Sequence, residues 1–303
     1  MPKTRISKSN LLYYVFHPAM FAVYFWIGIL ILVPNHFQKY SAEIIQTYLL
    51  GEGTKYYSHN LGDGAESEMI KSLHNFGANI PSVSYFDKDG KIINQWNLRG
   101  NWLIYQKLFF GDYNSNGYEE VYCLTRVNDS IFLNAKEVLL DSGLEIEDRF
   151  VCRTNYFNGN VVDVHDVNAK SIDINDDGKR EFIFTISTGF SLQPRNTFAY
   201  DFVVDSIFMS PISASGFAGR VNYLDINGDG IDEITGFTAA VENNHTNAPY
   251  TDSCSWLMVL NPKEGLDFLF PPIKYNGAFS SLSPEFYKIG SKDYIFCIYT
   301  SQV

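Results

Sequence analysis

A nine-residue pattern occurs three times in this 303-residue chain, and it restricts the fold more than any other feature of the sequence. Asp, Asn or Glu fills positions 1, 3, 5 and 9 of every copy, and Gly fills position 6. The copies are residues 112–120, 173–181 and 225–233, which we name loops 1, 2 and 3. Their first residues are 61 and 52 positions apart, so each loop belongs to a unit of fifty to sixty residues.

The residue types in these loops are those that bind a hard cation. Oxygen atoms at the four positions can converge on one ion, because glycine permits the positive φ that turns the backbone around it. Calcium accepts such a set more readily than magnesium, which requires a tight octahedron. The predicted ligands are Asp112, Asn114, Asn116 and Glu120 in loop 1; Asp173, Asn175, Asp177 and Glu181 in loop 2; and Asp225, Asn227, Asp229 and Glu233 in loop 3. Because loop 1 has the fewest carboxylates, it is predicted to bind most weakly.

Two other kinds of loop contain the same residue types. An EF-hand requires a glutamate at position 12 and a helix on each side, whereas position 12 here is Cys123, Phe184 or Gly236. The residues after position 9 are β-branched and aromatic, which indicates strands and excludes the EF-hand. An Asp/Asn/Gly turn without a metal remains the alternative for any single loop. The threefold recurrence favours calcium.

Between the loops lie short apolar or alternating stretches that are typical of strands. Residues 82–86 and 91–96 predict a hairpin around Asp87-Lys-Asp-Gly90, and residues 198–204 and 255–260 predict further strands. Each unit can therefore hold about four strands, which is the size of a propeller blade. Weaker copies of the loop at 60–68 and 285–293 are predicted to hold no metal, and residues 286–289 are predicted to form a strand.

On these loops and strands the chain resembles the FG-GAP or VCBS repeats of integrin-α-type β-propellers, in which calcium lies in a hairpin loop of the blade. The resemblance covers roughly residues 55–303. It implies an all-β fold, a β-propeller of about five blades, with calcium as the cofactor at the twelve positions given above. The chain stops after an aromatic strand without a closing segment, so we expect an incomplete ring and a fragment of a longer protein.

The first part of the chain predicts a membrane anchor. Residues 11–33 are a run of 23 without a charge, and no small-residue cleavage site follows, which favours an anchor over a signal peptide. Lysine and arginine precede the run, so the N-terminus is predicted to be cytoplasmic and the repeats periplasmic or extracellular. The predicted domains are a tail at 1–10, the transmembrane anchor at 11–33, a linker at 34–54 with a helix at 42–50, and the repeats at 55–303.

The excess of acidic residues and the absence of known catalytic motifs narrow the range of possible functions. Beyond the tail, 20 basic residues stand against 34 acidic ones, which argues against a nucleic-acid partner. Outside the cell, millimolar calcium would fill loops of modest affinity. The chain has no nucleophile elbow, Walker loop, dinucleotide fingerprint or zinc-binding helix, so it is not predicted to be an enzyme. Its four cysteines form no metal-binding pair and are predicted to be buried thiols.

The order of anchor and repeats is similar to that of bacterial sensor histidine kinases with FG-GAP ectodomains. This likeness implies a calcium-stabilised, ligand-binding or sensory propeller of a membrane-anchored signalling protein, with any kinase domain beyond residue 303. The alternative is a surface adhesion or glycan-binding propeller without signalling output, because the abundant aromatic residues can stack on sugars. A propeller-based lyase or hydrolase is the least favoured alternative.

Overall fold

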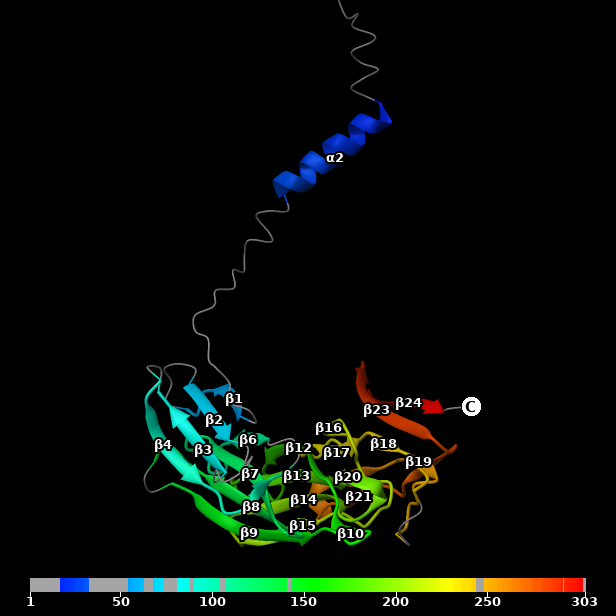
Figure 1. Ribbon diagram of the computed structural model, residues 1–303. Coiled ribbons are helices and arrows are strands. Elements are labelled where there is room, and N and C mark those ends of the chain that lie inside the picture. Colours follow the sequence, from blue (N-terminus) through cyan, green and yellow to red (C-terminus); the bar gives the residue numbers. More distant parts are fainter. Residues whose placement is uncertain are drawn as a thin grey trace, which may run out of the picture. The chain divides into compact units, whose positions relative to one another are not determined.

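The computed structural model contains two compact units, Met1–Leu49 and Leu50–Val303, which we describe separately. Most of the described chain is β-structure (Figure 1), which confirms the predicted predominance of strands. The described residues are 17–32, 54–62, 68–73, 81–87, 90–103, 107–140, 143–243, 248–290 and 292–301.

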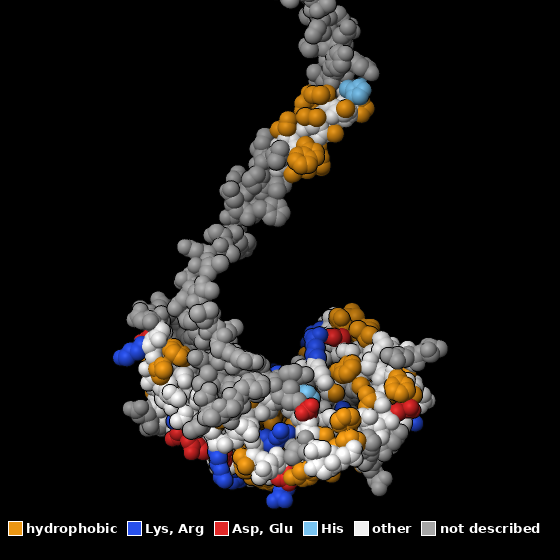
Figure 2. Space-filling view, in the orientation of Figure 1, with side chains coloured by type: hydrophobic (Ala, Val, Ile, Leu, Met, Phe, Trp, Pro, Cys, Tyr) orange, Lys and Arg blue, Asp and Glu red, His pale blue; other side chains and the backbone are white. Residues whose placement is uncertain are grey.

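The first unit contains helix α2 (Pro18–Leu32), which begins at a proline and contains no charged residue. Large apolar side chains of the helix are exposed, and Figure 2 shows them on one face; Phe21, Phe25 and Trp26 are 56%, 70% and 64% exposed. Among the described residues, no helix reaches the length and apolarity that crossing a membrane requires. Most of the rest of the predicted anchor, and the helix predicted at 42–50, lie outside the described residues.

The described residues of the second unit form four larger antiparallel sheets that follow one another along the chain. The first sheet consists of β1 (Thr54–His59), β2 (Glu68–Leu73), β3 (Ser82–Phe86) and β4 (Ile92–Asn97). The second consists of β7 (Glu120–Val127), β8 (Ser130–Lys136) and β9 (Glu145–Arg153), with β5 (Asn101–Trp102) and β6 (Leu108–Gly111) both paired to β7. The third consists of β12 (Val164–Ile172), β13 (Glu181–Thr188), β14 (Arg195–Asp201) and β15 (Ser206–Met209). The fourth consists of β16 (Val221–Leu224), β17 (Glu233–Gly236), β20 (Val259–Asn261) and β21 (Asp267–Phe268).

Smaller sheets complete the described part of this unit. The last along the chain is formed by β18 (Thr238–Ala239), β23 (Ser280–Ile289) and β24 (Lys292–Ser301). Two-stranded sheets are formed by β10 (Tyr156–Phe157) with β11 (Asn160–Val161), and by β19 (Cys254–Leu257) with β22 (Ile273–Asn276). Short 3-10 helices occur at η1 (Gly189–Ser191) and η2 (Pro262–Glu264). Among the described residues, no strand pairing joins the first sheet to the last.

Several strand predictions are confirmed and two are corrected. The hairpin predicted at 82–96 is formed by β3 and β4, and residues 286–289 lie in β23. The strand predicted at 198–204 ends at Asp201. The Asp201 side chain accepts hydrogen bonds from the N–H groups of Val203 and Val204, and a turn starts there. The single strand predicted at 255–260 is two strands, β19 and β20, which pair in different sheets. The division occurs at Met258, whose carbonyl accepts a hydrogen bond from Thr235 Oγ1.

The sheets pack face to face in chain order. Strand β13 is buried along its whole length, so both of its faces contact a neighbouring sheet. Phe182 and Phe184 pack against the second sheet, whereas Ile183 lies in a cluster with the fourth. Similar clusters join the first sheet to the second, and the fourth to the last. Each large apolar side chain buried in these clusters stabilises the fold by about 1.5–3 kcal/mol.

None of the four cysteines is in a disulfide; Cys123 and Cys254 are buried as predicted, whereas Cys152 and Cys297 are only partly buried. Burial raises the pKa of the Cys152 thiol from 9.0 to about 12. Because the thiolate is the reacting form, native Cys152 should be alkylated by iodoacetamide at pH 8 about a thousandfold more slowly than in the unfolded chain. Timed alkylation with mass spectrometry, in buffer and in guanidinium chloride, measures the ratio. Equal rates in the two solutions would contradict the prediction.

Candidate metal loops

The three loops occupy equivalent places in three successive sheets. Loops 1, 2 and 3 connect β6 to β7, β12 to β13 and β16 to β17, and each of these pairs is antiparallel. The hairpin setting predicted from the sequence is therefore confirmed. Loops 1 and 2 are in contact, because the Arg180 N–H donates to the Tyr113 carbonyl at 2.7 Å and Lys179 lies 5.8 Å from the Tyr113 ring. Loop 3 is joined to the third sheet by an ion pair between Asp232 and Lys170.

All three loops have the same internal hydrogen bonds. The glycine N–H at position 6 donates to the first aspartate at 2.9, 2.9 and 3.0 Å in loops 1, 2 and 3. The N–H at position 5 donates to the side-chain oxygen at position 3, and the N–H at position 7 donates to that at position 5. Each position-6 glycine has a positive φ, between 82° and 90°, as predicted. The twelve predicted residues are thus brought together four to a loop.

The glutamate at position 9 is buried in every loop. Glu120, Glu181 and Glu233 are 0%, 1% and 0% exposed, and each begins the second strand of its sheet. One oxygen of each accepts the N–H of position 2, at 2.9, 2.8 and 2.7 Å. Burial raises the pKa of Glu120 and of Glu181 to about 7, and it also raises that of Glu233. A buried carboxylate is costly unless a cation or hydrogen-bond donors compensate its charge.

In the loops, the charge of the buried glutamates is compensated mainly by neutral hydrogen-bond donors, and the compensation is incomplete. Asn175 and Asn227 direct their amide nitrogens toward the glutamate of the same loop, at 3.2 and 2.7 Å. Glu120 Oε1 and Asp173 Oδ1 are buried without a hydrogen-bond partner among the described residues. These oxygens, with the remaining carboxylates and amides, fit a hard cation. No three His, Cys, Asp or Glu side chains converge as a metal cluster in the described part of the chain, and calcium binding stays a prediction.

A further polar position, which the sequence analysis missed, faces each loop from the third strand of its sheet. The strand register places this position opposite the buried glutamate. Extending the pairing of the second and third strands by one residue pair toward the loop brings the two residues face to face. These residues are 2%, 4% and 8% exposed; they are Glu137 for loop 1, Asp201 for loop 2 and Asn261 for loop 3. They follow the glutamates at unequal intervals in the sequence, so only strand register reveals their equivalence.

The weak loop copy predicted at 60–68 also contacts loop 1. The Glu119 N–H donates to the Leu61 carbonyl at 2.8 Å, and Asn60 Oδ1 accepts the Gly62 N–H at 2.8 Å. Gly62 has a φ of 111°, and a Cβ built on it would lie 1.8 Å from the Gly117 carbonyl oxygen. This close approach requires glycine. Residues 63–67 lie outside the described residues.

Substitution Gly62→Ala is therefore expected to lower the free energy of unfolding by about 2–4 kcal/mol, because it combines backbone strain with a steric clash. Urea unfolding of the variant measures this loss. Gly90→Ala is the matched control, since Gly90 also has a positive φ but nothing within 4 Å of an added Cβ. The control should lose about 1 kcal/mol. Equal losses in the two variants would show that the contact with loop 1 does not matter.

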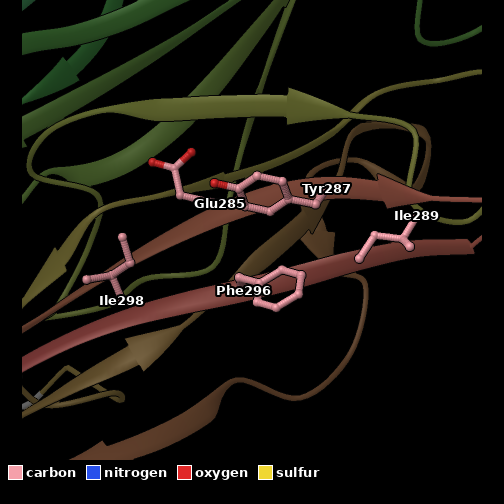
Figure 3. Close-up of a pocket in the computed structure, with 5 residues that line it drawn as sticks. All are labelled: Glu285, Tyr287, Ile289, Phe296 and Ile298. Carbon is pink, nitrogen blue, oxygen red and sulfur yellow. The ribbon is translucent and has the colours of Figure 1, made fainter.

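An apolar hollow of about 290 Å³ lies on the β23–β24 hairpin, and none of its lining residues belongs to a loop. Figure 3 shows Glu285, Tyr287 and Ile289 on one strand beside Phe296 and Ile298 on the next. The apolar lining residues are each about half exposed, between 48% and 58%. Glu285 is paired with Arg220 at 3.1 Å. The hollow suits apolar or aromatic contact rather than acid–base chemistry.

Comparisons with known proteins leave the family open. No family model, no curated protein and no solved structure matches the chain. The resemblance to FG-GAP repeats therefore stays a prediction.

Proposed function

We propose that this chain is a calcium-stabilised β-propeller that faces outward from a membrane and binds or senses a ligand for a signalling protein. The observation that carries the proposal is the recurrence of one hydrogen-bonded loop, with a buried glutamate at its end, in three successive sheets. Sheets of about four antiparallel strands that pack in chain order support the propeller, because blades are built and packed in this way.

Calcium has a structural role in this proposal. The ion would bind between the first and second strands of a sheet, where carboxylates and amides of one loop lie together. The chain's own residues fix the turn through their backbone hydrogen bonds and hold the buried glutamate at its end. Positive charge at this point would offset the cost of burying the glutamate. We therefore propose no catalytic role for the loops.

The membrane anchor rests on the character of helix α2. A helix that is apolar on all sides is suited to a protein core or to lipid, and large side chains of α2 are exposed. An outward orientation would place the loops in millimolar calcium, which matches external calcium-binding modules.

A second candidate function is adhesion to a protein or glycan without signalling, and the hollow on β23–β24 favours it. Exposed aromatic side chains such as Tyr287 and Phe296 provide flat surfaces for stacking on sugars or on a partner's apolar residues. Glycan-array binding with a Phe296→Ser variant as control would distinguish adhesion from a purely sensory role.

Isothermal titration of the full chain in detergent with calcium tests the proposal. We expect about three sites with Kd of about 0.1–1 mM and little response to magnesium. The control is a triple variant, Asp112→Asn with Asp173→Asn and Asp225→Asn, which should bind no calcium. If the folded wild-type chain takes up no calcium, the loops are ordinary turns and the proposal fails.

The orientation needs a separate measurement in cells. A C-terminal reporter enzyme that is active only outside the cytoplasm should be active when fused to the full chain. An expressed but inactive fusion would contradict the proposed orientation.

A further inference from the structure

The third-strand residue opposite the buried glutamate differs between the loops. In loop 2 it is Asp201, which is 4% exposed and whose Oδ2 lies 3.4 Å from Asn175 Nδ2. The same amide nitrogen lies 3.2 Å from Glu181 Oε1, so two carboxylates meet at one donor. Backbone N–H groups already bind the other oxygen of each acid, so these two oxygens share one neutral amide, which is a weak partner for two buried carboxylates.

In loop 1 the equivalent residue is Glu137, which is 2% exposed. Its Oε1 accepts a hydrogen bond from Asn116 Nδ2 at 2.9 Å, so it reaches a predicted ligand of the loop. Beside it, Glu120 is fully buried and its Oε1 has no partner among the described residues. This unpartnered oxygen is a second indication of a cation-binding site, independent of the acidic composition.

In loop 3 the equivalent residue is neutral. Asn261 Oδ1 accepts a hydrogen bond from the Lys263 N–H at 3.0 Å and so caps the start of helix η2. The Lys263 ammonium lies 3.9 Å from Asp229 Oδ2, so a resident positive charge already neutralises part of this loop.

We propose that Glu137 and Asp201 each supply an additional carboxylate to the calcium sites of loops 1 and 2, and that loop 3 lacks this carboxylate. The inference rests on the proposed calcium binding and deepens it. Loop 2 then has four carboxylates and loops 1 and 3 have three each, while Lys263 opposes a cation in loop 3. Loop 2 fills first as calcium rises, because ligand charge tunes affinity, and loop 1 has as many carboxylates as loop 3. The ranking from sequence, which placed loop 1 last, changes accordingly.

A chain with one remaining site tests the role of Asp201. Full-length protein with Asp112→Asn and Asp225→Asn retains loop 2, and calcium titration gives its Kd. Adding Asp201→Asn should weaken that Kd about tenfold. Asparagine keeps an oxygen for the N–H groups of Val203 and Val204, so the turn is preserved. Asp205→Asn is the matched control, because it removes the same charge from the more exposed end of the turn and should leave Kd unchanged.

The gain of a carboxylate in loop 3 is the complementary test. Full-length protein with Asp112→Asn and Asp173→Asn retains loop 3, and Asn261→Asp should tighten its Kd about tenfold. Aspartate also accepts the N–H at the start of η2, so the cap of this helix is kept. Melting temperatures in EDTA verify that every variant is folded.

The outcomes separate this inference from the proposed function. Unchanged Kd in both the Asp201→Asn and the Asn261→Asp chains overturns the inference while calcium binding by the loops stands. Loss of all calcium binding in both single-site parents, with the chains still folded, means that the proposed function fails and the inference fails with it.

Discussion

In about 2 mM calcium the full chain is expected to melt roughly ten degrees higher than in EDTA. A site filled at ten times its Kd stabilises the folded state by about 1.4 kcal/mol, so three sites supply about 4 kcal/mol. For a domain of this size each kcal/mol raises the melting temperature by about 2–4 °C. Differential scanning calorimetry in EDTA, calcium and magnesium measures the shift.

The control for this melt is an amide substitution at the first loop position. Asp225 accepts three backbone N–H groups, from residues 228, 229 and 230, so Asp225→Ala would also remove hydrogen bonds that exist without metal. Asp225→Asn keeps one acceptor oxygen and removes the charge. It should lower the melting temperature in calcium and change it little in EDTA. A drop of equal size in both solutions would exclude Asp225 as a ligand.

The same measurement has an expected pH dependence. Burial raises the pKa of Glu120 and Glu181 from 4.5 to about 7, so the calcium-free fold prefers their protonated forms. Their contribution to stability is fully present below pH 4.5 and is lost as pH rises through 7. The melting temperature in EDTA should therefore fall over this interval, and the effect of calcium should grow. An effect of calcium that is constant from pH 5 to pH 8 would contradict this explanation.

Phe182→Ala is expected to lower the free energy of unfolding by about 3–5 kcal/mol. Phe182 is 1% exposed and joins two sheets, since its ring stacks on Tyr122 of the second sheet at 4.3 Å and on Phe184 of its own at 5.3 Å. Truncation would leave a cavity between them, which rigid strands fill poorly. Urea unfolding of the variant in EDTA isolates this packing effect from any metal.

Phe208→Ala is the matched control for Phe182→Ala. Phe208 lies on β15 in the same sheet, but it is 38% exposed. Its truncation should cost about 1 kcal/mol or less, because Phe208 is already partly exposed to water and its removal opens no enclosed cavity. Similar losses in the two variants would show that the interface between the second and third sheets contributes little to stability.

Local patterns in the sequence predicted the loops and hairpins, because their conformations depend on neighbouring residues. Glycine at position 6 and oxygen-bearing side chains at positions 1, 3 and 5 fix the turn through bonds within nine residues. Strand periodicity likewise located β3, β4 and β23. The division at Met258 was missed, because an uninterrupted apolar run contains no sign of a change of sheet.

The polar residues that face the loops from the third strand required the structure. Glu137, Asp201 and Asn261 differ in chemistry and in distance along the chain from the glutamates they oppose. Register between the second and third strands depends on the length of the connecting turns and on packing of both faces, which local periodicity does not contain. The three residues are seen to be equivalent only when the pairing of the second and third strands is extended to the end of the strands at the loop.

Because the sheets pack in chain order, the free energy of unfolding of this unit depends mainly on contacts between sheets that follow one another along the chain. A sheet in such a series shares its buried faces with the sheet before it and the sheet after it, so its stability is the sum of its own strands and two neighbouring interfaces. Disruption of the third sheet removes two interfaces at once, whereas disruption of the first removes one. Whole units can accordingly be gained or lost at the ends of the series with less disturbance than in its middle.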